Sequence, residues 1–134
     1  MQLNPYLMFD GQCEAAFKFY EQCFGGKLEA MLRYGEAPDC GDIPAECSDR
    51  IMHACLVIDG QKLMASDTTP QYPHEGIKGC SVTLNVDSLA EAERLFKALS
   101  EKFQLRFFRT SGAGGRSEVL GDAPINGSRI HLAT

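Results

Sequence analysis

The feature that most constrains this fold is an internal repeat. With a shift of 77 positions, residues 9–28 align with residues 86–105 without a gap. The matched pairs are Asp10 with Asp87, Glu14 with Glu91, Ala15 with Ala92, Phe19 with Phe96 and Leu28 with Leu105. A second match, at a shift of 67, places residues 58–63 on residues 125–130. We interpret the repeat as two copies of one folding unit, and chance similarity between two amphipathic segments is the alternative.

Hydrophobic spacing gives both copies the same order of elements, namely a strand, a helix and three strands. In the first copy we expect strands at 6–9, 28–34, 51–58 and 62–65, and a helix at about 13–24. In the second copy we expect strands at 81–86, 103–108, 119–121 and 129–133, and a helix after Ser88. Asp59-Gly60 and Asn126-Gly127 are two-residue hairpin signals, and Ser88 with Glu91 forms a capping box.

This repeat predicts the fold class. A sheet that carries one helix leaves its second face uncovered, so the two copies are expected to share one curved mixed sheet. The sequence therefore predicts an α+β fold of two tandem βαβββ modules, at about 3–67 and 79–134, within a single domain 1–134. A chain of 134 residues is of the usual size for one domain.

Composition excludes several classes of function. The formal net charge is −5, from 13 basic and 18 acidic residues, which argues against general nucleic-acid binding. The sequence contains no apolar run of the roughly 20 residues that a membrane span needs, and Asn4, Pro5 and Asp10 interrupt the apolar stretch that a signal peptide requires. We therefore expect a cytoplasmic protein with no membrane partner. The six cysteines include no C-x-x-C pair, so we expect reduced, buried thiols.

Several short motifs resemble the PhnB-like branch of the vicinal oxygen chelate superfamily, which includes glyoxalases, bleomycin-resistance proteins and extradiol dioxygenases. They are residues 5–11 (PYLMFDG), 15–20 (AAFKFY), 24–26 (FGG), 34–36 (YGE), 51–54 (IMHA) and 63–67 (LMASD). The resemblance covers residues 5 to about 101. The tail differs, because the family's tail contains tryptophan and this chain has none.

The resemblance implies the glyoxalase-like fold, a homodimer and four places for metal ligands. These places fall near Asn4 or Pro5, near Met64, near Ser81 or Val82, and near His131. Zinc, nickel or iron needs strong nitrogen, oxygen or thiolate donors, and His131 alone fits that requirement. We therefore expect no bound metal and no other cofactor.

The branch is also described as a demethylubiquinone methyltransferase family. A methyltransferase of the common kind has a glycine-rich loop between its first strand and helix for the methionine-derived cofactor. Here the corresponding turn is DGQC, residues 10–13. The residues therefore give that description no support.

The candidate site is a concave sheet surface that binds a small organic molecule. Alternating strand residues predicted to line it are Tyr6, Met8, Met64, Thr83 and His131. His53 joins them as an acid, a base or a hydrogen-bond donor if it faces the same side. Mostly apolar walls with a few polar groups are typical of small-molecule sites. The alternative is that these residues fill the core.

The leading hypothesis is a PhnB-like, glyoxalase-fold homodimer that binds a small organic ligand without the superfamily metal. One alternative is a metal-dependent lyase or dioxygenase of the same superfamily. Another is a bleomycin-type drug-sequestering protein, for which the acidic segment 35–50 suits a cationic drug. A fourth is a module that only interacts with other proteins. The sequence leaves open the ligand's identity and the role of the acidic segment.

Overall fold

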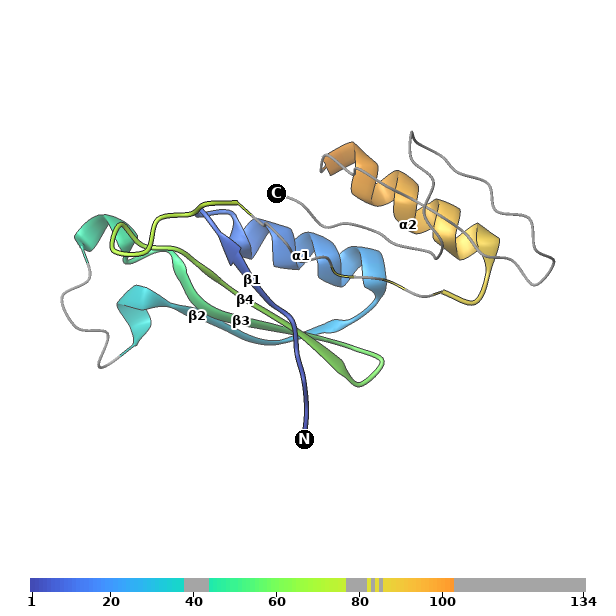
Figure 1. The fold of residues 1–134 in the computed structure, drawn as a ribbon, viewed down its shortest axis with the longest axis horizontal. Helices are drawn as coiled ribbons and strands as arrows, with labels where there is room; N and C mark the ends of the chain where they lie inside the picture. The colour runs from blue at the N-terminus through green and yellow to red at the C-terminus, as the bar shows by residue number, and fades with distance from the viewer. Residues whose placement is uncertain (38–43, 77–81, 83, 85, 103–134) are drawn as a thin grey trace. The chain divides into compact units, whose positions relative to one another are not determined.

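The computed structural model describes residues 1–37, 44–76, 82, 84 and 86–102 (Figure 1). The chain divides into two compact units, Met1–Gly76 and Ile77–Thr134. The architecture is α+β, with one mixed sheet and two α-helices among the described residues.

The first unit contains the predicted order of strand, helix and three strands. Its elements are β1 (Tyr6–Phe9), α1 (Cys13–Phe24), β2 (Lys27–Arg33), β3 (Ile51–Ile58) and β4 (Gln61–Asp67), with short 3-10 turns at Tyr34–Glu36 and Ala45–Cys47. The strand at 6–9, the helix at 13–24 and the strand at 51–58 are confirmed to the residue. The last strand is longer than the predicted 62–65, since it continues to Asp67.

The four strands form a mixed sheet in the order β1-β4-β3-β2 (Figure 1). The pairs β2 with β3 and β3 with β4 are antiparallel, whereas β1 runs parallel to β4 with Tyr6 opposite Met64 and Phe9 opposite Asp67. The first and last strands of the unit are therefore neighbours. Residues that are 58 positions apart in sequence, such as Met8 and Ser66, lie side by side in register.

Helix α1 covers one face of this sheet and forms the core with it (Figure 1). Phe9, Phe17 and Tyr20 are fully buried, and the rings of Phe9 and Phe17 meet edge to face at 6.2 Å. Leu7, Ala54, Leu56, Leu63 and Ala65 complete the core from the strands. Burial of a large apolar side chain contributes roughly 1.5–3 kcal/mol. The face that packs against α1 is thus the main source of stability in this unit.

Two turns that contain glycine reverse the chain. One connects α1 to β2 and the other connects β3 to β4. Helix α1 ends at Gly25, which has a left-handed φ of 68° and donates its N–H to the Glu21 carbonyl at 3.1 Å. The β3–β4 hairpin turns through Asp59 and Gly60, which have φ values of 47° and 78°. Positive φ at both central residues is the conformation that Asp-Gly favours. The predicted hairpin and helix stop are confirmed.

Helix α2 (Leu89–Lys102) is the described element of the second unit. The Ser88 hydroxyl oxygen accepts the Glu91 N–H at 3.2 Å, which confirms the predicted N-terminal cap. The Glu91 carboxylate pairs with Arg94 at 2.7 Å. Ala92, Leu95 and Leu99 of this helix are buried.

The tandem βαβββ organisation stays a prediction for the second module. Of the strand expected at 81–86, residues 82, 84 and 86 are described and none is in a strand. The strands expected at 103–108, 119–121 and 129–133 lie outside the described residues.

The described cysteines agree with the prediction of buried, reduced thiols. Cys13, Cys23, Cys47 and Cys55 are buried free thiols, whereas Cys40 and Cys80 lie outside the described residues. Within the ranges that the structure describes, no helix has the length and apolar character needed to cross a membrane.

Candidate functional site

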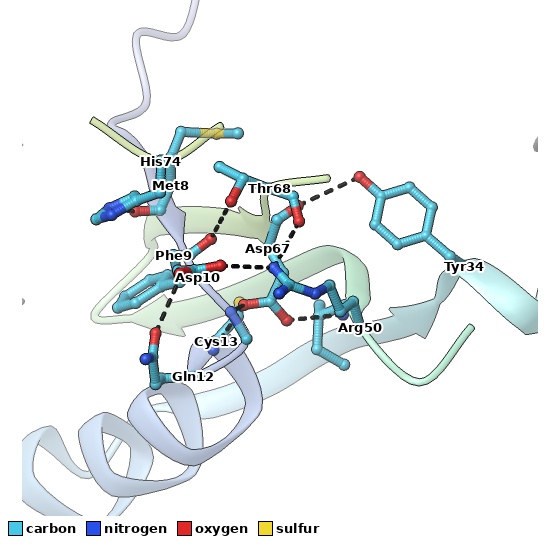
Figure 2. A network of polar contacts seen from close by, with 12 residues as sticks. Met8, Phe9, Asp10, Gln12, Cys13, Tyr34, Arg50, Asp67, Thr68 and His74 are labelled. Atoms are coloured by element: carbon cyan, nitrogen blue, oxygen red, sulfur yellow. Dashed lines mark hydrogen bonds and ion pairs between the residues drawn. The ribbon is translucent and has the colours of Figure 1, made fainter. Parts of the chain in front are cut away.

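Asp67 is the most extensively bonded polar residue on the α1 side of the sheet (Figure 2). Its side chain lies at the end of β4 and the residue is 1% exposed. One carboxylate oxygen accepts the N–H groups of Gly11 at 2.8 Å and Cys13 at 3.0 Å. The other accepts the Ile51 N–H at 2.8 Å. This carboxylate therefore binds the first turn of α1 and the start of β3 to the end of β4.

Further hydrogen bonds connect the residues next to Asp67 (Figure 2). The Arg50 guanidinium donates to the Asp10 carboxylate and to the Thr68 carbonyl, each at 2.8 Å. The Thr68 hydroxyl donates to the Phe9 carbonyl at 3.1 Å, and the Tyr34 hydroxyl donates to the Asp67 carbonyl at 3.3 Å. These bonds join β1 and the end of β4 to the segments that contain Tyr34 and Arg50. The cluster satisfies backbone groups, so we assign it to folding.

The Cys13 thiol, beside Asp67, is poorly suited to nucleophilic chemistry. Burial raises the pKa of this thiol to about 12, and the negative charges of Asp67 and Glu14 add to the effect. The thiolate is the reactive form of cysteine. Cys13 therefore stays protonated near neutral pH and acts as a small apolar core residue.

The opposite sheet face, which we call the distal face, holds the four predicted site residues that the structure describes. Side chains in a strand alternate between faces, and paired residues of neighbouring strands share a face. Leu7, Ala65 and Ala54 point to α1, which places Tyr6 and Met8 of β1, Met64 and Ser66 of β4, and His53 and Cys55 of β3 on the distal face. Tyr6 is 47% exposed and Met8 is 40% exposed.

Tyr6 and His53 make a direct polar contact on the distal face. The Tyr6 hydroxyl lies 3.2 Å from His53 Nδ1, and the ring centroids are 5.9 Å apart with an interplanar angle of 31°. β4 lies between their two strands, so the Tyr6 side chain extends across β4 to reach β3. An imidazole and a phenol in contact can donate and accept hydrogen bonds at one place.

Met8 lies beside this pair and is held at two points. The Ser66 hydroxyl is 3.4 Å from Met8 Sδ, and His74 Nε2 is 3.1 Å from the Met8 carbonyl oxygen. The second contact supplies a partner to β1, which is an edge strand of the sheet that the described residues form. Thus the thioether faces the side on which Tyr6 and His53 lie, while the backbone is fixed by the 68–76 segment.

The ionic groups next to this region neutralise each other. Lys62 Nζ lies 2.6 Å from Glu29 Oε2, and the Cys55 thiol lies 3.7 Å from the same oxygen. The hydrogen bond from Lys62 lowers the pKa of Glu29, so the pair is ionised near neutral pH. Burial raises the pKa of the Cys55 thiol. The charges of Lys62 and Glu29 are therefore compensated within this pair.

Four of the six predicted site residues come together in the structure. Tyr6, Met8, His53 and Met64 occupy the same face, and Tyr6 contacts His53. Thr83 and His131 lie outside the described residues. Sequence reasoning assigned no role to Asp67, although the alternation of Leu63, Ala65 and Asp67 would have placed this carboxylate on the buried face.

The described residues do not provide a metal site of the expected kind. No three His, Cys, Asp or Glu side chains within the described ranges gather closely enough to hold an ion. At the two predicted positions in the first unit, the Pro5 carbonyl accepts the Met64 N–H at 3.1 Å, and Met64 offers a soft thioether. These two positions do not fit a metal that needs imidazole or carboxylate ligands.

The mixed sheet with its helix on one face, together with the sequence, places the chain in a known class of protein. A profile of the family described as 3-demethylubiquinone-9 3-methyltransferase matches residues 1–112, and the chain belongs to this PhnB-like family. It is 30% identical over 129 residues to protein YjdN of Escherichia coli strain K12, covering 89% of this chain and 87% of that protein.

Solved structures agree with this assignment. Protein PA1353 of Pseudomonas aeruginosa is 48% identical to this chain, with a TM-score of 0.70. The match covers 89% of this chain and 95% of PA1353. A Bacillus cereus PhnB protein, described as a putative 3-demethylubiquinone-9 3-methyltransferase, is 19% identical with a TM-score of 0.61. That match covers 87% of this chain and 95% of the Bacillus protein. The second likeness supports the fold alone.

The family description implies a methionine-derived methyl donor, and the residues at the first turn do not fit one of the common kind. A nucleotide cofactor of an open α/β fold lies against free backbone N–H groups at a glycine-rich turn before a helix. Here the N–H groups of Gly11 and Cys13 are bonded to the Asp67 carboxylate. These two N–H groups are therefore not free to bind a cofactor of that kind.

Proposed function

We propose that this chain is a glyoxalase-fold protein of the vicinal oxygen chelate superfamily that binds a small organic ligand on the distal face. The observation that carries the proposal is the Tyr6–His53 contact, with the Met8 and Met64 thioethers on the same face. Small-molecule sites combine apolar walls with a few oriented polar groups. The roles expected for Thr83 and His131, which lie outside the described residues, stay predictions of the sequence.

The proposal includes binding without the superfamily's metal. Its support is the donor chemistry of the first unit, because Pro5 and Met64 stand at two of the positions where ligands are expected. A thioether and an engaged carbonyl bind zinc, nickel or iron weakly. The ligand is therefore proposed to be held by hydrogen bonds and apolar contact.

A fragment screen by two-dimensional NMR tests the binding surface. We expect organic fragments to shift the signals of Tyr6, Met8, His53 and Met64 together, while signals of the α1 side stay unchanged. Fragments that shift only the α1 side, or no signals at all, would disprove the proposed surface. Cys55, which faces the same side but is 4% exposed, serves as an internal marker for unfolding.

Metal analysis of the purified protein tests the second part of the proposal. We expect less than stoichiometric zinc, nickel, iron or manganese, and no activity in a glyoxalase and dioxygenase screen. One tightly held metal per chain, with turnover that a chelator removes, would instead establish the metal-dependent enzyme.

We also propose a cytoplasmic homodimer. The support for the dimer is the resemblance to the family, and light scattering with size-exclusion chromatography tests it. The expected mass is twice the chain mass of 14.7 kDa. A monomeric mass over a wide range of concentrations would contradict it.

A further inference from the structure

The Tyr6–His53 pair constrains what kind of group a ligand can present. In one arrangement the Tyr6 hydroxyl donates to His53 Nδ1, so Nε2 carries the proton and donates outward, while the phenol oxygen can still accept. In the other, protonated Nδ1 donates to the phenol oxygen, so Nε2 accepts and the Tyr6 hydroxyl donates outward. With either neutral tautomer of His53, the pair offers one hydrogen-bond donor and one acceptor to a ligand.

Among the described residues, none hydrogen-bonds to His53 Nε2. A group that both donates and accepts one hydrogen bond matches the pair in either tautomer. A hydroxyl group has this property. A carboxylate only accepts and an ammonium only donates, so each leaves one group of the neutral pair unmatched.

The surroundings of the pair favour an uncharged, flat molecule. Lys62 is paired with Glu29 at 2.6 Å, so neither ion offers an unneutralised charge to a ligand. Met8 and Met64 supply polarizable thioethers, which make favourable contacts with aromatic rings. The Tyr6 and His53 rings add aromatic surface on the same face.

We propose that the distal face selects a hydroxyl-bearing aromatic molecule of the phenol class, with the Tyr6–His53 pair binding its hydroxyl group and Met8 and Met64 contacting its ring. This inference rests on the proposed function, because it assigns a ligand class to the same surface. It identifies Tyr6 as a specificity-determining residue.

The test compares three probes that share one ring and one methyl group, namely p-cresol, p-toluate and toluene. Each is titrated into the full-length protein at neutral pH and followed by NMR. We expect p-cresol to bind about three- to tenfold more tightly than toluene, which corresponds to one net hydrogen bond. We expect p-toluate to bind more weakly than p-cresol because it cannot donate.

Tyr6→Phe and Tyr72→Phe form a matched pair of variants. Tyr72 is 74% exposed in the 68–76 segment, so its substitution removes a hydroxyl group elsewhere on the surface. We expect Tyr6→Phe to lose the preference for p-cresol over toluene while its affinity for toluene stays within about twofold. Tyr72→Phe is expected to keep the wild-type preference.

The possible failures are distinguishable. Equal binding of p-cresol and toluene, tighter binding of p-toluate, or a preference that survives in Tyr6→Phe would overturn the phenol assignment and leave the proposed binding surface standing. Absence of binding by all three probes, together with a negative fragment screen, would overturn both.

Discussion

The two faces of the β1-β4-β3-β2 sheet use polar residues differently. On the α1 side the polar group is Asp67, which is 1% exposed and bonded to three backbone N–H groups. On the distal face the polar pair is Tyr6 and His53, which bond to each other, with Tyr6 47% exposed. A buried carboxylate with backbone partners stabilises a fold, whereas an exposed pair retains capacity for a ligand.

The comparison shows why burial helps to separate structural from functional polar groups. Asp67 is chemically the stronger candidate, because a carboxylate beside a cysteine suggests acid–base or nucleophilic chemistry. Its partners show instead that it joins α1 to β3 and β4. Tyr6 and His53 make fewer contacts, and that makes them the better candidates for binding. The four predictions below test this difference.

The largest expected effect compares adjacent residues of β1 that face opposite sides. Phe9→Ala is expected to lower the free energy of unfolding by about 3–5 kcal/mol, because it leaves a cavity beside Phe17. Met8→Ala is expected to cost less than about 1 kcal/mol, since Met8 is partly exposed. Urea denaturation followed by circular dichroism measures both, and Phe9→Leu provides a milder variant if Phe9→Ala does not fold. Equal losses for Phe9→Ala and Met8→Ala would show that the two faces are packed alike.

Asp67→Asn tests the structural role of the carboxylate. We expect a loss of about 2–3 kcal/mol, because the amide nitrogen cannot accept one of the three backbone N–H groups. Asp59→Asn is the control, since Asp59 is exposed with a φ of 47° that asparagine tolerates. The same denaturation measurement applies. If both variants lost equally little stability, Asp67 would have no special role in folding.

Glu14 provides a partly exposed carboxylate for comparison with Asp67. Hydrogen bonds from Lys18 and then Arg33 lower its pKa below 4.5, so its contribution is present above that pH and is lost as the pH falls through the native pKa. Glu14→Gln is expected to cost about 0.5 kcal/mol at neutral pH and progressively less as the pH falls through the native pKa of Glu14. Denaturation at several pH values measures this difference. In an Arg33→Gln background the effect of Glu14→Gln should be smaller, and an unchanged pH dependence there would exclude the Arg33 pairing as a cause.

The smallest expected effect is that of Tyr6→Phe on stability. We expect less than about 0.5 kcal/mol, because the hydroxyl group lies on a partly exposed surface. Tyr34→Phe is the matched variant on the α1 side, where the hydroxyl bonds to the Asp67 carbonyl, and it should cost about 1 kcal/mol. Thermal and urea unfolding measure both. A larger loss for Tyr6→Phe than for Tyr34→Phe would reverse the proposed roles of the two faces.

The local elements of the first unit follow from sequence pattern. The apolar spacing of Cys13, Phe17 and Tyr20 gives the helix, and Gly25 ends it. Asp59-Gly60 gives the hairpin, because few other pairs adopt positive φ at both positions at low cost. These features depend on residues within one turn or one strand pair of each other, so the sequence alone was sufficient.

The candidate site was predictable in part for a similar reason. Strand alternation correctly grouped Tyr6 with Met8, and placed His53 opposite to Met52 and Ala54. It did not show that Tyr6 reaches His53, because this contact requires β1 and β3 to lie on either side of β4. The partners of Asp67 were also missed, since they come from two other segments more than 15 residues away.

The sequence by itself determined where α1, α2 and the strands of the first unit lie, which residues are apolar, and that residues 9–28 recur as 86–105. The tertiary structure decided the parallel pairing of β1 with β4, the burial of Asp67 against three backbone N–H groups, and the meeting of Tyr6 and His53. Periodicity and turn preference act over a few residues, whereas these contacts arise only when distant strands pair and a carboxylate replaces water as the partner of buried amides.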